Sequence, residues 1–470
     1  MNDIVENRTF DEIQIGDQAS LTRALDQETF EALATLTGNF SLFDLDPGPG
    51  DTSMISQGGG QTSWSAALFA SLAGTRLPGL GSVTQHIDIR LHRPVAIGVP
   101  VTATATVKAK RAETGIVVLD CQATDPTGAE IATGTLEVRA PREKMRHSLI
   151  DMPKVQLRRD NRYLELLKAC EGLPALGCAV VHPCSPDALL GAIEAAEHKL
   201  ITPILIGPED KIRSIAEQER LDISGYRLVP AEHSHHSAEL AVAMVLAGEA
   251  QTLMKGSLHT DELLGQVVKK VGGLRTERRI SHCFLLNVPT YPRPIIVTDA
   301  AINIQPTLED KVNIIQNAIE LAHAIGIAEP KVAILSAVET VTNKIPSTLE
   351  AGALCKMADR GQIVGGILDG PLAFDNAIDE QAAHTKGIHS PVAGKADILV
   401  VPDLEAGNML AKQLTFMANA EAAGIVLGAR APIILTSRAD SAQTRLASCA
   451  VAVLFAEAQR KGAALQKARG

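Results

Sequence analysis

Residues 83–138 alternate between apolar and polar positions in the way that β-strands do. Four segments carry the pattern, with Gly, Pro and Asp turn residues between them: VTQHIDIRLHRPV, VTATATVKAKRA, GIVVLDCQATD and EIATGTLEVRA. The stretch before them, residues 61–72, is rich in Ala, Ser and Leu and is typical of a helix. One helix followed by an antiparallel meander predicts a small α+β unit.

The pattern changes further along the chain. Residues 139–162 are basic and lose the periodicity, which predicts a linker. Helical stretches then alternate with short apolar runs, and Ser185 with Pro186 marks one helix start while Thr307 caps another. The runs are ALGCAVV, ITPILIG, KVAILS, QIVGGILD, ADILVVP, GIVLG and PIILTS. Because strands that are apolar on both faces need helices on both sides, this region predicts a mainly parallel, covered sheet.

Composition and charge narrow the class of protein. Only 3% of the 470 residues are aromatic, which suits Ala-rich helices covering a parallel sheet. A net charge of −10 argues against nucleic acid and acidic membranes as partners but allows a local basic pocket for a small anion. The start of the chain lacks the apolar run of a signal peptide and no apolar stretch reaches spanning length, so we expect a cytoplasmic protein without membrane contact.

Cysteine and histidine do not indicate a metal centre. Seven scattered cysteines without a Cys-x-x-Cys pair predict reduced thiols. The neighbours His233, His235 and His236 lie in a polar stretch and are interpreted as solvated surface. We expect no metal and no tightly bound cofactor.

The first 140 residues resemble the MaoC-type enoyl-CoA hydratases in the segments TFDEIQIGD, FEALATLTGNFSLFDLDP and LPGLGSVTQHIDIRLHRPVAIG. The resemblance implies an α+β hotdog fold, in which a sheet wraps a central helix, and usually a dimer. Asn39 replaces the family's catalytic Asp, and Asp44 replaces its catalytic His. A carboxamide and a solvated carboxylate cannot cycle a proton near neutral pH, so we expect hydratase activity to be lost.

The rest of the chain resembles the phosphate acetyltransferase and phosphate butyryltransferase family, with the butyryl branch as the expected nearer relative. The segments that carry the likeness are LMKGSLHTDELL, GLRTERRISH, YPRPIIVTDAAINIQPTLEDKVNIIQNAIELA, PKVAILSAVE, RGQIVGGILDGPLAFDNAI, ADILVVPDLEAGNMLAKQL and PIILTSRADS. The resemblance implies two α/β subdomains and reversible acyl transfer between coenzyme A and inorganic phosphate.

The residues after PIILT suit this chemistry. Ser437 and Arg438 lie between a strand and the next helix, where parallel sheets collect ligands and helix N-termini attract phosphate. Arg438 offers a bidentate fork for phosphate, and Ser437 offers a hydrogen bond to the thioester. The base stays open, because the carboxylate of the acetyltransferase branch is replaced by Thr444. Asp440 and Asp369 are the acidic candidates, although Asp440 could simply cap the helix.

Further residues are candidates for binding the substrates, namely Lys255, Thr260, Arg275, Asn303, Asp369 and Asn408. Arg278 and Arg279 extend the basic group, while Gly256, Gly370 and Gly407 are expected to allow close backbone approach.

The predicted protein has a hotdog domain at 1–140, a linker at 141–160 and an acyltransferase of two subdomains with mainly parallel sheet at 161–470. We expect it to form homo-oligomers and to use acyl-CoA and phosphate or acyl phosphate as substrates, by direct transfer without an acyl-enzyme. Two alternatives stay open: a bifunctional hydratase and acyltransferase, and a C-terminal region that only senses acyl-CoA.

Overall fold

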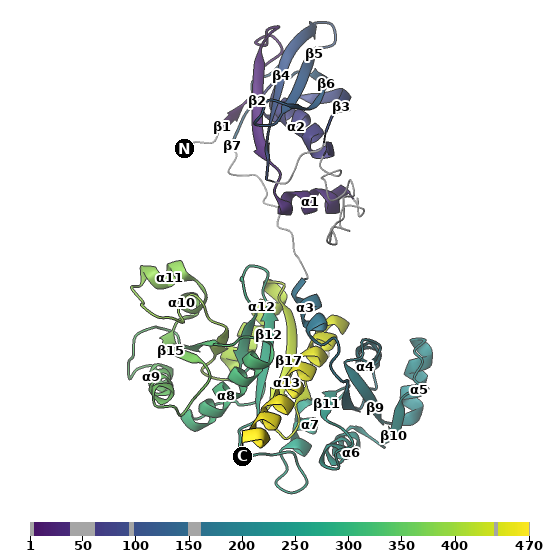
Figure 1. Ribbon diagram of the computed structural model, residues 1–470, viewed down its shortest axis with the longest axis vertical. Coiled ribbons are helices and arrows are strands. Elements are labelled where there is room, and N and C mark those ends of the chain that lie inside the picture. Colours follow the sequence, from purple (N-terminus) through teal and green to yellow (C-terminus); the bar gives the residue numbers. More distant parts are fainter. Residues whose placement is uncertain (1–3, 38–61, 94–97, 149–160, 437–439, 470) are drawn as a thin grey trace. The chain divides into compact units, whose positions relative to one another are not determined.

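The computed structural model describes residues 4–37, 62–93, 98–148, 161–436 and 440–469. The chain divides into two compact units, Met1–Arg158 and Arg159–Gly470 (Figure 1). Within the described residues, none of the helices combines the length and apolarity needed to cross a bilayer. The finer boundaries expected at 140 and 161 stay a prediction.

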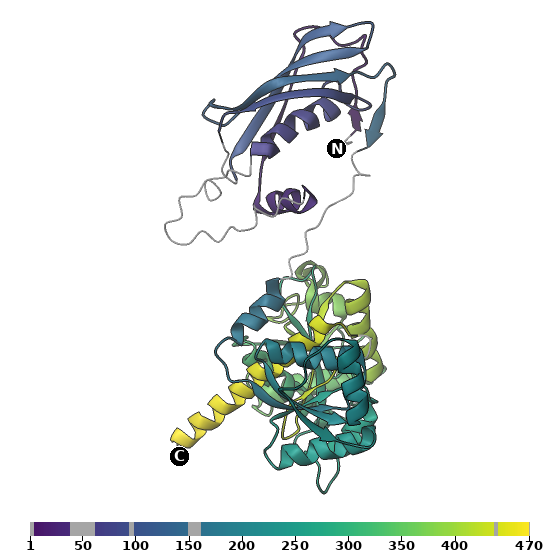
Figure 2. The same cartoon turned by 90° about the vertical axis from the view of Figure 1, so that its right-hand side faces the viewer.

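The first unit is a curved antiparallel sheet around one long helix (Figure 2). Its elements are β1 (Ile4–Glu6), β2 (Gln18–Ala24), α1 (Gln27–Thr37), α2 (Thr62–Thr75), β3 (Val83–Leu91), β4 (Pro100–Arg111), β5 (Ile116–Thr124), β6 (Glu130–Arg139) and β7 (Arg146–Ser148). The five main strands follow the order β2-β4-β5-β6-β3. This is the expected hotdog fold, which is confirmed, and the predicted helix and four strands correspond to α2 and β3–β6.

The core of this unit lies between α2 and the inner face of the sheet. Phe69 and Leu72 of α2 are fully buried against strand side chains such as Val101 and Leu119. The structure differs from the sequence expectation at β7, which pairs with β1 inside the segment expected to be a linker. Its three residues are too few to produce a readable periodicity, and the pairing partner is more than 130 positions away.

The second unit is a covered α/β structure. Its elements are α3 (Asn161–Ala169), β8 (Leu176–Val181), α4 (Pro186–Glu197), β9 (Ile201–Gly207), α5 (Glu209–Gln218), β10 (Arg227–Pro230), α6 (Ser234–Leu246), β11 (Thr252–Lys255), α7 (Thr260–Val267), β12 (Ser281–Asn287), β13 (Ile295–Thr298), α8 (Leu308–Ala324), β14 (Lys331–Leu335), α9 (Pro346–Asp359), β15 (Ile367–Leu372), α10 (Phe374–Ile378), α11 (Glu380–Thr385), β16 (Ile398–Val400), α12 (Leu404–Met417), β17 (Glu421–Leu427), β18 (Ile433–Ile434) and α13 (Ala442–Arg469).

One continuous sheet of eleven strands crosses this unit in the order β10-β9-β8-β11-β18-β17-β12-β13-β16-β14-β15. The expectation of a mainly parallel sheet is confirmed, with two parallel groups on either side of an antiparallel centre. Strand β17 is antiparallel to both β18 and β12, and β12 is antiparallel to β13. The two parallel groups consequently run in opposite directions and end at opposite edges.

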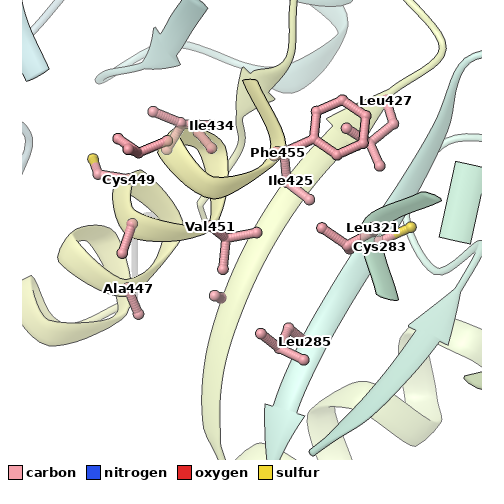
Figure 3. Close-up of a cluster of buried hydrophobic side chains, with 14 of the residues drawn as sticks. Cys283, Leu285, Leu321, Ile425, Leu427, Ile434, Ala447, Cys449, Val451 and Phe455 are labelled. Carbon is pink, nitrogen blue, oxygen red and sulfur yellow. The ribbon is translucent and has the colours of Figure 1, made fainter. Parts of the chain in front are cut away.

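Helix α13, at the C-terminal end of the chain, packs across the middle of this sheet (Figure 3). Val451 and Phe455 of α13 pack on Ile425 of β17, and Cys283 of β12 belongs to the same buried cluster. The sequence signals at other helix starts are confirmed: Ser185 precedes Pro186 at the start of α4, and the Thr307 side chain accepts a hydrogen bond from the Asp310 N–H at α8.

Candidate active site

Strands β8, β9, β11 and β18 are parallel and end together, at what we call the carboxyl edge. Helices α4, α5, α6 and α7 each follow one of these strands or their neighbour β10, so their N-termini gather at the same edge. Open α/β sheets bind ligands there, because free backbone N–H groups and helix dipoles favour anions. The carboxyl edge is therefore the natural place for a phosphate-handling site.

Two buried cations meet at the end of β18. Lys255 is 4% exposed and its Nζ donates to the carbonyl oxygen of Thr436 at 3.4 Å. Arg445 is 3% exposed and its Nη1 donates to the Thr436 hydroxyl at 2.8 Å. Burial lowers the pKa of Arg445, while the carboxylates of Asp440 and Asp187 act in the opposite direction. Both cations therefore hold Thr436, the residue that precedes Ser437 and Arg438 in the sequence.

Glycine is required where β11 leaves the sheet. A Cβ atom at Gly256 would lie 2.4 Å from the Val181 carbonyl oxygen and 2.6 Å from that of His182. Similar backbone contacts, at 2.7 Å, would arise at Gly370 and Gly407. The expectation that these three glycines permit close approach is confirmed.

We expect Arg445→Met to weaken the fold around Thr436. Methionine keeps an unbranched stem that can pack on Gly191, where an added Cβ would lie 2.6 Å from Arg445 Cδ, but it loses the charged hydrogen bond to Thr436. The expected loss is about 1.5–3 kcal/mol of unfolding free energy, measured by urea denaturation. Arg460→Met on the exposed side of the same helix is the matched control. Equal urea midpoints for the two variants would contradict a role for the Thr436 contact.

The other catalytic candidates occupy different places. Ser437 and Arg438 lie outside the described residues, as do Asn39 and Asp44 of the first unit. Asp440 is partly exposed just before α13.

Asp369 lies on β15, and its carboxylate accepts the Gly370 N–H at 2.9 Å. Six strand spacings separate β15 from β18, about 29 Å along the sheet. This separation favours Asp440 over Asp369 as the base that would act with the residues after β18. The role of each stays a prediction.

Thr260 is the first residue of α7 at the carboxyl edge and is partly exposed. It follows His259, whose backbone N–H donates to Glu262 at 3.0 Å. Ser234 of α6 also donates to Glu262, at 3.2 Å. One carboxylate therefore ties the N-termini of α6 and α7 together at the carboxyl edge.

Asn303 belongs to a second polar cluster, after β13. Its Nδ2 donates to Asp299 at 2.5 Å and to the Ile280 carbonyl oxygen at 2.9 Å, and its Oδ1 accepts from Arg279 at 2.6 Å. Burial raises the pKa of Asp299, although three backbone N–H groups oppose that effect. Asn408 donates to Ala300 O at 3.1 Å in the same turn. These amides fix the backbone around Asp299.

Arg275 lies apart from Lys255. It is exposed and pairs with Ala429 just beyond the end of β17, and because β17 is antiparallel to β18, that position is the amino end of β18. Arg278 forms an ion pair with Glu320 at 2.6 Å in the same region. A cavity of about 410 Å³ opens here, lined by Thr276, Glu277, Arg278, Asn317, Glu320, Gly428, Ala429, Phe455 and Gln459. The structure therefore does not bring Arg275 together with Lys255, and a binding role for Arg275 stays a prediction.

Sequence reasoning missed two residues of the carboxyl edge, His182 and Arg445. His182 directly follows the buried run of β8, and a polar residue at the end of a parallel strand is a signal that could have identified it. Arg445 lacks such a signal, since burial of an arginine on an N-terminal helical turn depends on tertiary packing. Among the described residues, no group of His, Cys, Asp and Glu is arranged to hold a metal ion. His233 instead caps α6 by accepting the His236 N–H.

The fold and this edge define an α/β protein with a buried cationic site at the ends of parallel strands. Residues 232–453 match the family described as phosphate acetyl/butaryl transferase. A phosphate acetyltransferase of Rhizobium meliloti is 62% identical over 300 residues, which cover 64% of this chain and 95% of that protein. A phosphate butyryltransferase of Clostridium beijerinckii is 42% identical over 292 residues, covering 62% of this chain and 97% of that protein.

A crystal structure of a branched-chain phosphotransacylase from Enterococcus faecalis V583 superposes with a TM-score of 0.53 at 30% identity, covering 60% of this chain and 98% of that one. The chain belongs to the phosphate acetyl/butyryltransferase family and is an acyltransferase. The expected nearer likeness to the butyryl branch is wrong as judged by identity, because the acetyltransferase relative is the more similar of these two.

Proposed function

We propose that the protein transfers a short acyl group reversibly between coenzyme A and inorganic phosphate at the carboxyl edge of β8, β11 and β18. The observation that carries this placement is the pair of buried cations, Lys255 and Arg445, that both donate to Thr436. Ser437 and Arg438 come next in the chain and are proposed to contact the thioester and the phosphate. Family membership supports the reaction.

The proposed transfer is direct. In one direction a phosphate oxygen attacks the acyl carbon, the carbon–sulfur bond breaks, and the thiolate leaves and takes up a proton. Cations near the developing oxyanion and the phosphate lower the barrier, because they stabilise the charge that develops in the transition state. Coenzyme A is thus a substrate, and we propose no tightly bound cofactor.

Release of free thiol from acetyl-, propionyl- and butyryl-CoA in the presence of phosphate tests the proposal. Phosphate-dependent release with at least one of these substrates is expected, and the ranking of the three defines the acyl-chain preference. Binding of acyl-CoA without phosphate-dependent release would favour a sensing role and would refute the transferase proposal.

We propose that the first unit keeps an acyl-CoA fold without hydratase activity, because Asn39 and Asp44 stand in place of an acid–base pair. The full-length protein is expected to leave crotonyl-CoA unhydrated, measured as constant absorbance of the enoyl thioester. Hydration at ordinary enzymatic rates would instead establish the bifunctional alternative.

Two further proposals concern the cell and the assembly. The cysteines Cys121, Cys170, Cys178, Cys184, Cys283, Cys355 and Cys449 are all free, which suits a reducing compartment such as the cytoplasm. On edge strand β3 the exposed fractions of Val83, Ile87 and Leu91 are 58%, 50% and 42%. Such an apolar sheet edge favours self-association. Size-exclusion chromatography with light scattering measures the oligomer.

A further inference from the structure

We infer that His182 is the general acid–base group of the transfer, taking the proton from the thiol of coenzyme A and returning it to the departing thiolate. The inference rests on the proposed function and supplies the group that the sequence left undecided. Its basis is the position of His182, its hydrogen bond to Ser237 and the charges around its ring.

His182 lies at the centre of the carboxyl edge. It immediately follows β8, and its carbonyl oxygen accepts the Ser257 N–H at 2.8 Å just beyond β11. Val181 is in register with Lys255, and Leu253 is in register with Ile433, so β11 lies between His182 and the end of β18. With neighbouring strands about 4.8 Å apart, the backbones of His182 and Thr436 are about 10 Å apart.

The hydrogen bonds around Ser237 determine which nitrogen of His182 carries the proton. Ser237 is fully buried on α6 and its hydroxyl donates to the His233 carbonyl oxygen at 2.9 Å. A serine hydroxyl has one hydrogen, so its oxygen must accept from His182 Nδ1, which lies 3.3 Å away. We therefore assign the proton to Nδ1 and the free lone pair to Nε2. The described part of the chain offers Nε2 no hydrogen-bond partner, although the ring is partly exposed.

The surroundings favour the neutral form of this ring by lowering its pKa. Partial burial lowers the pKa of His182, and Lys211 of α5 lowers it further. Glu262 of α7 raises it, while His233 at the start of α6 lowers it. A neutral imidazole with a lone pair on Nε2 can accept a thiol proton, which neither Lys255 nor Arg445 can do in its charged form.

The backbone also indicates a functional position. His182 has φ of 53°, in the left-handed region that non-glycine residues seldom adopt. Such conformations cost free energy and are concentrated at functional sites. The resulting turn separates the ring from β8 and directs it toward α6.

The chemistry balances without any further reactant. In the thiol-consuming direction, His182 Nε2 takes the thiol proton, the thiolate forms a bond to the acyl carbon of the acyl phosphate, and the carbon–oxygen bond to phosphate breaks. The phosphate leaves with the electron pair of that bond and takes up the proton from the imidazolium, which returns His182 to its neutral form. In the opposite direction the attacking hydrogen phosphate gives its proton to Nε2, and the imidazolium passes that proton to the thiolate as the carbon–sulfur bond breaks.

His182→Asn is the decisive variant, because asparagine tolerates the left-handed backbone and its amide can still donate to Ser237 but cannot act as a base. We expect kcat for acetyl phosphate plus coenzyme A to fall about 100-fold to 1,000-fold at pH 7.5, with the KM for acetyl phosphate unchanged. The acid limb of the rate–pH profile should disappear, and added imidazole should restore part of the rate. His198→Gln, an exposed change at the far end of α4, is the control.

Activity of His182→Asn within about threefold of wild type, or a fall with the acid limb unchanged, would overturn the assignment.

Ser237→Ala gives an independent check, since it keeps the imidazole and removes only its orienting partner. A milder loss, about tenfold, with the acid limb retained is expected, and an unchanged rate would contradict the tautomer assignment. Inactivity of the wild-type enzyme itself would refute the proposed function, which distinguishes the two failures.

Discussion

Arg438→Ala is expected to lower kcat/KM for phosphate by about 100-fold to 1,000-fold, the usual effect of removing one charged donor from a closed site. Arginine presents a planar fork that matches two phosphate oxygens, and alanine leaves the developing charge without that contact. The measurement is initial thiol release with phosphate varied at saturating acyl-CoA. The KM for acyl-CoA should change much less, because Arg438 is proposed to contact the phosphate and not the thioester.

Two companion variants make the Arg438 result interpretable. Arg438→Lys keeps the charge but loses the fork, so we expect a rate between those of wild type and the alanine variant. Arg460→Ala, on an exposed turn of α13, controls for loss of a positive charge elsewhere. Unchanged phosphate kinetics in Arg438→Ala would remove Arg438 from the site.

His282 is expected to make the enzyme lose about 3 kcal/mol of stability on acidification, judged from its pKa shift. The side chain is fully buried on β12, and neither ring nitrogen forms a hydrogen bond of normal geometry within the described residues. Burial lowers the pKa of His282 from 6.5 to about 4, with a weaker opposing contribution from the Leu435 backbone.

The direction of the effect follows from proton binding. Between pH 6.5 and 4 the unfolded chain binds a proton at His282 that the folded chain does not. The stabilisation is therefore complete above pH 6.5 and declines as the pH falls toward 4. His282→Leu removes the titrating group, so its urea midpoint should fall less than that of wild type over this interval. His384→Leu, an exposed change, is the control, and parallel curves for wild type and His282→Leu would contradict the argument.

The local signals in the sequence were reliable because they depend on neighbours along the chain. Pro186 is the first residue of α4 and has a backbone angle suited to that position, and Thr307 caps α8 through a contact with Asp310 within one turn. Alternation in residues 83–138 predicted four strands for the same reason. Contacts between distant segments could not be predicted in this way, as the pairing of β7 with β1 shows.

The sequence by itself determined the fold class and the family, because long ordered segments carry those features, while the roles of Ser437 and Arg438 stay predictions. Only the tertiary structure decided which strand ends meet. The antiparallel centre of the sheet places Arg275 at the amino end of β18 and Lys255 at the carboxyl edge, although both belong to one stretch of sequence. Burial of Arg445 likewise arises from packing between distant elements, which chain neighbours do not encode.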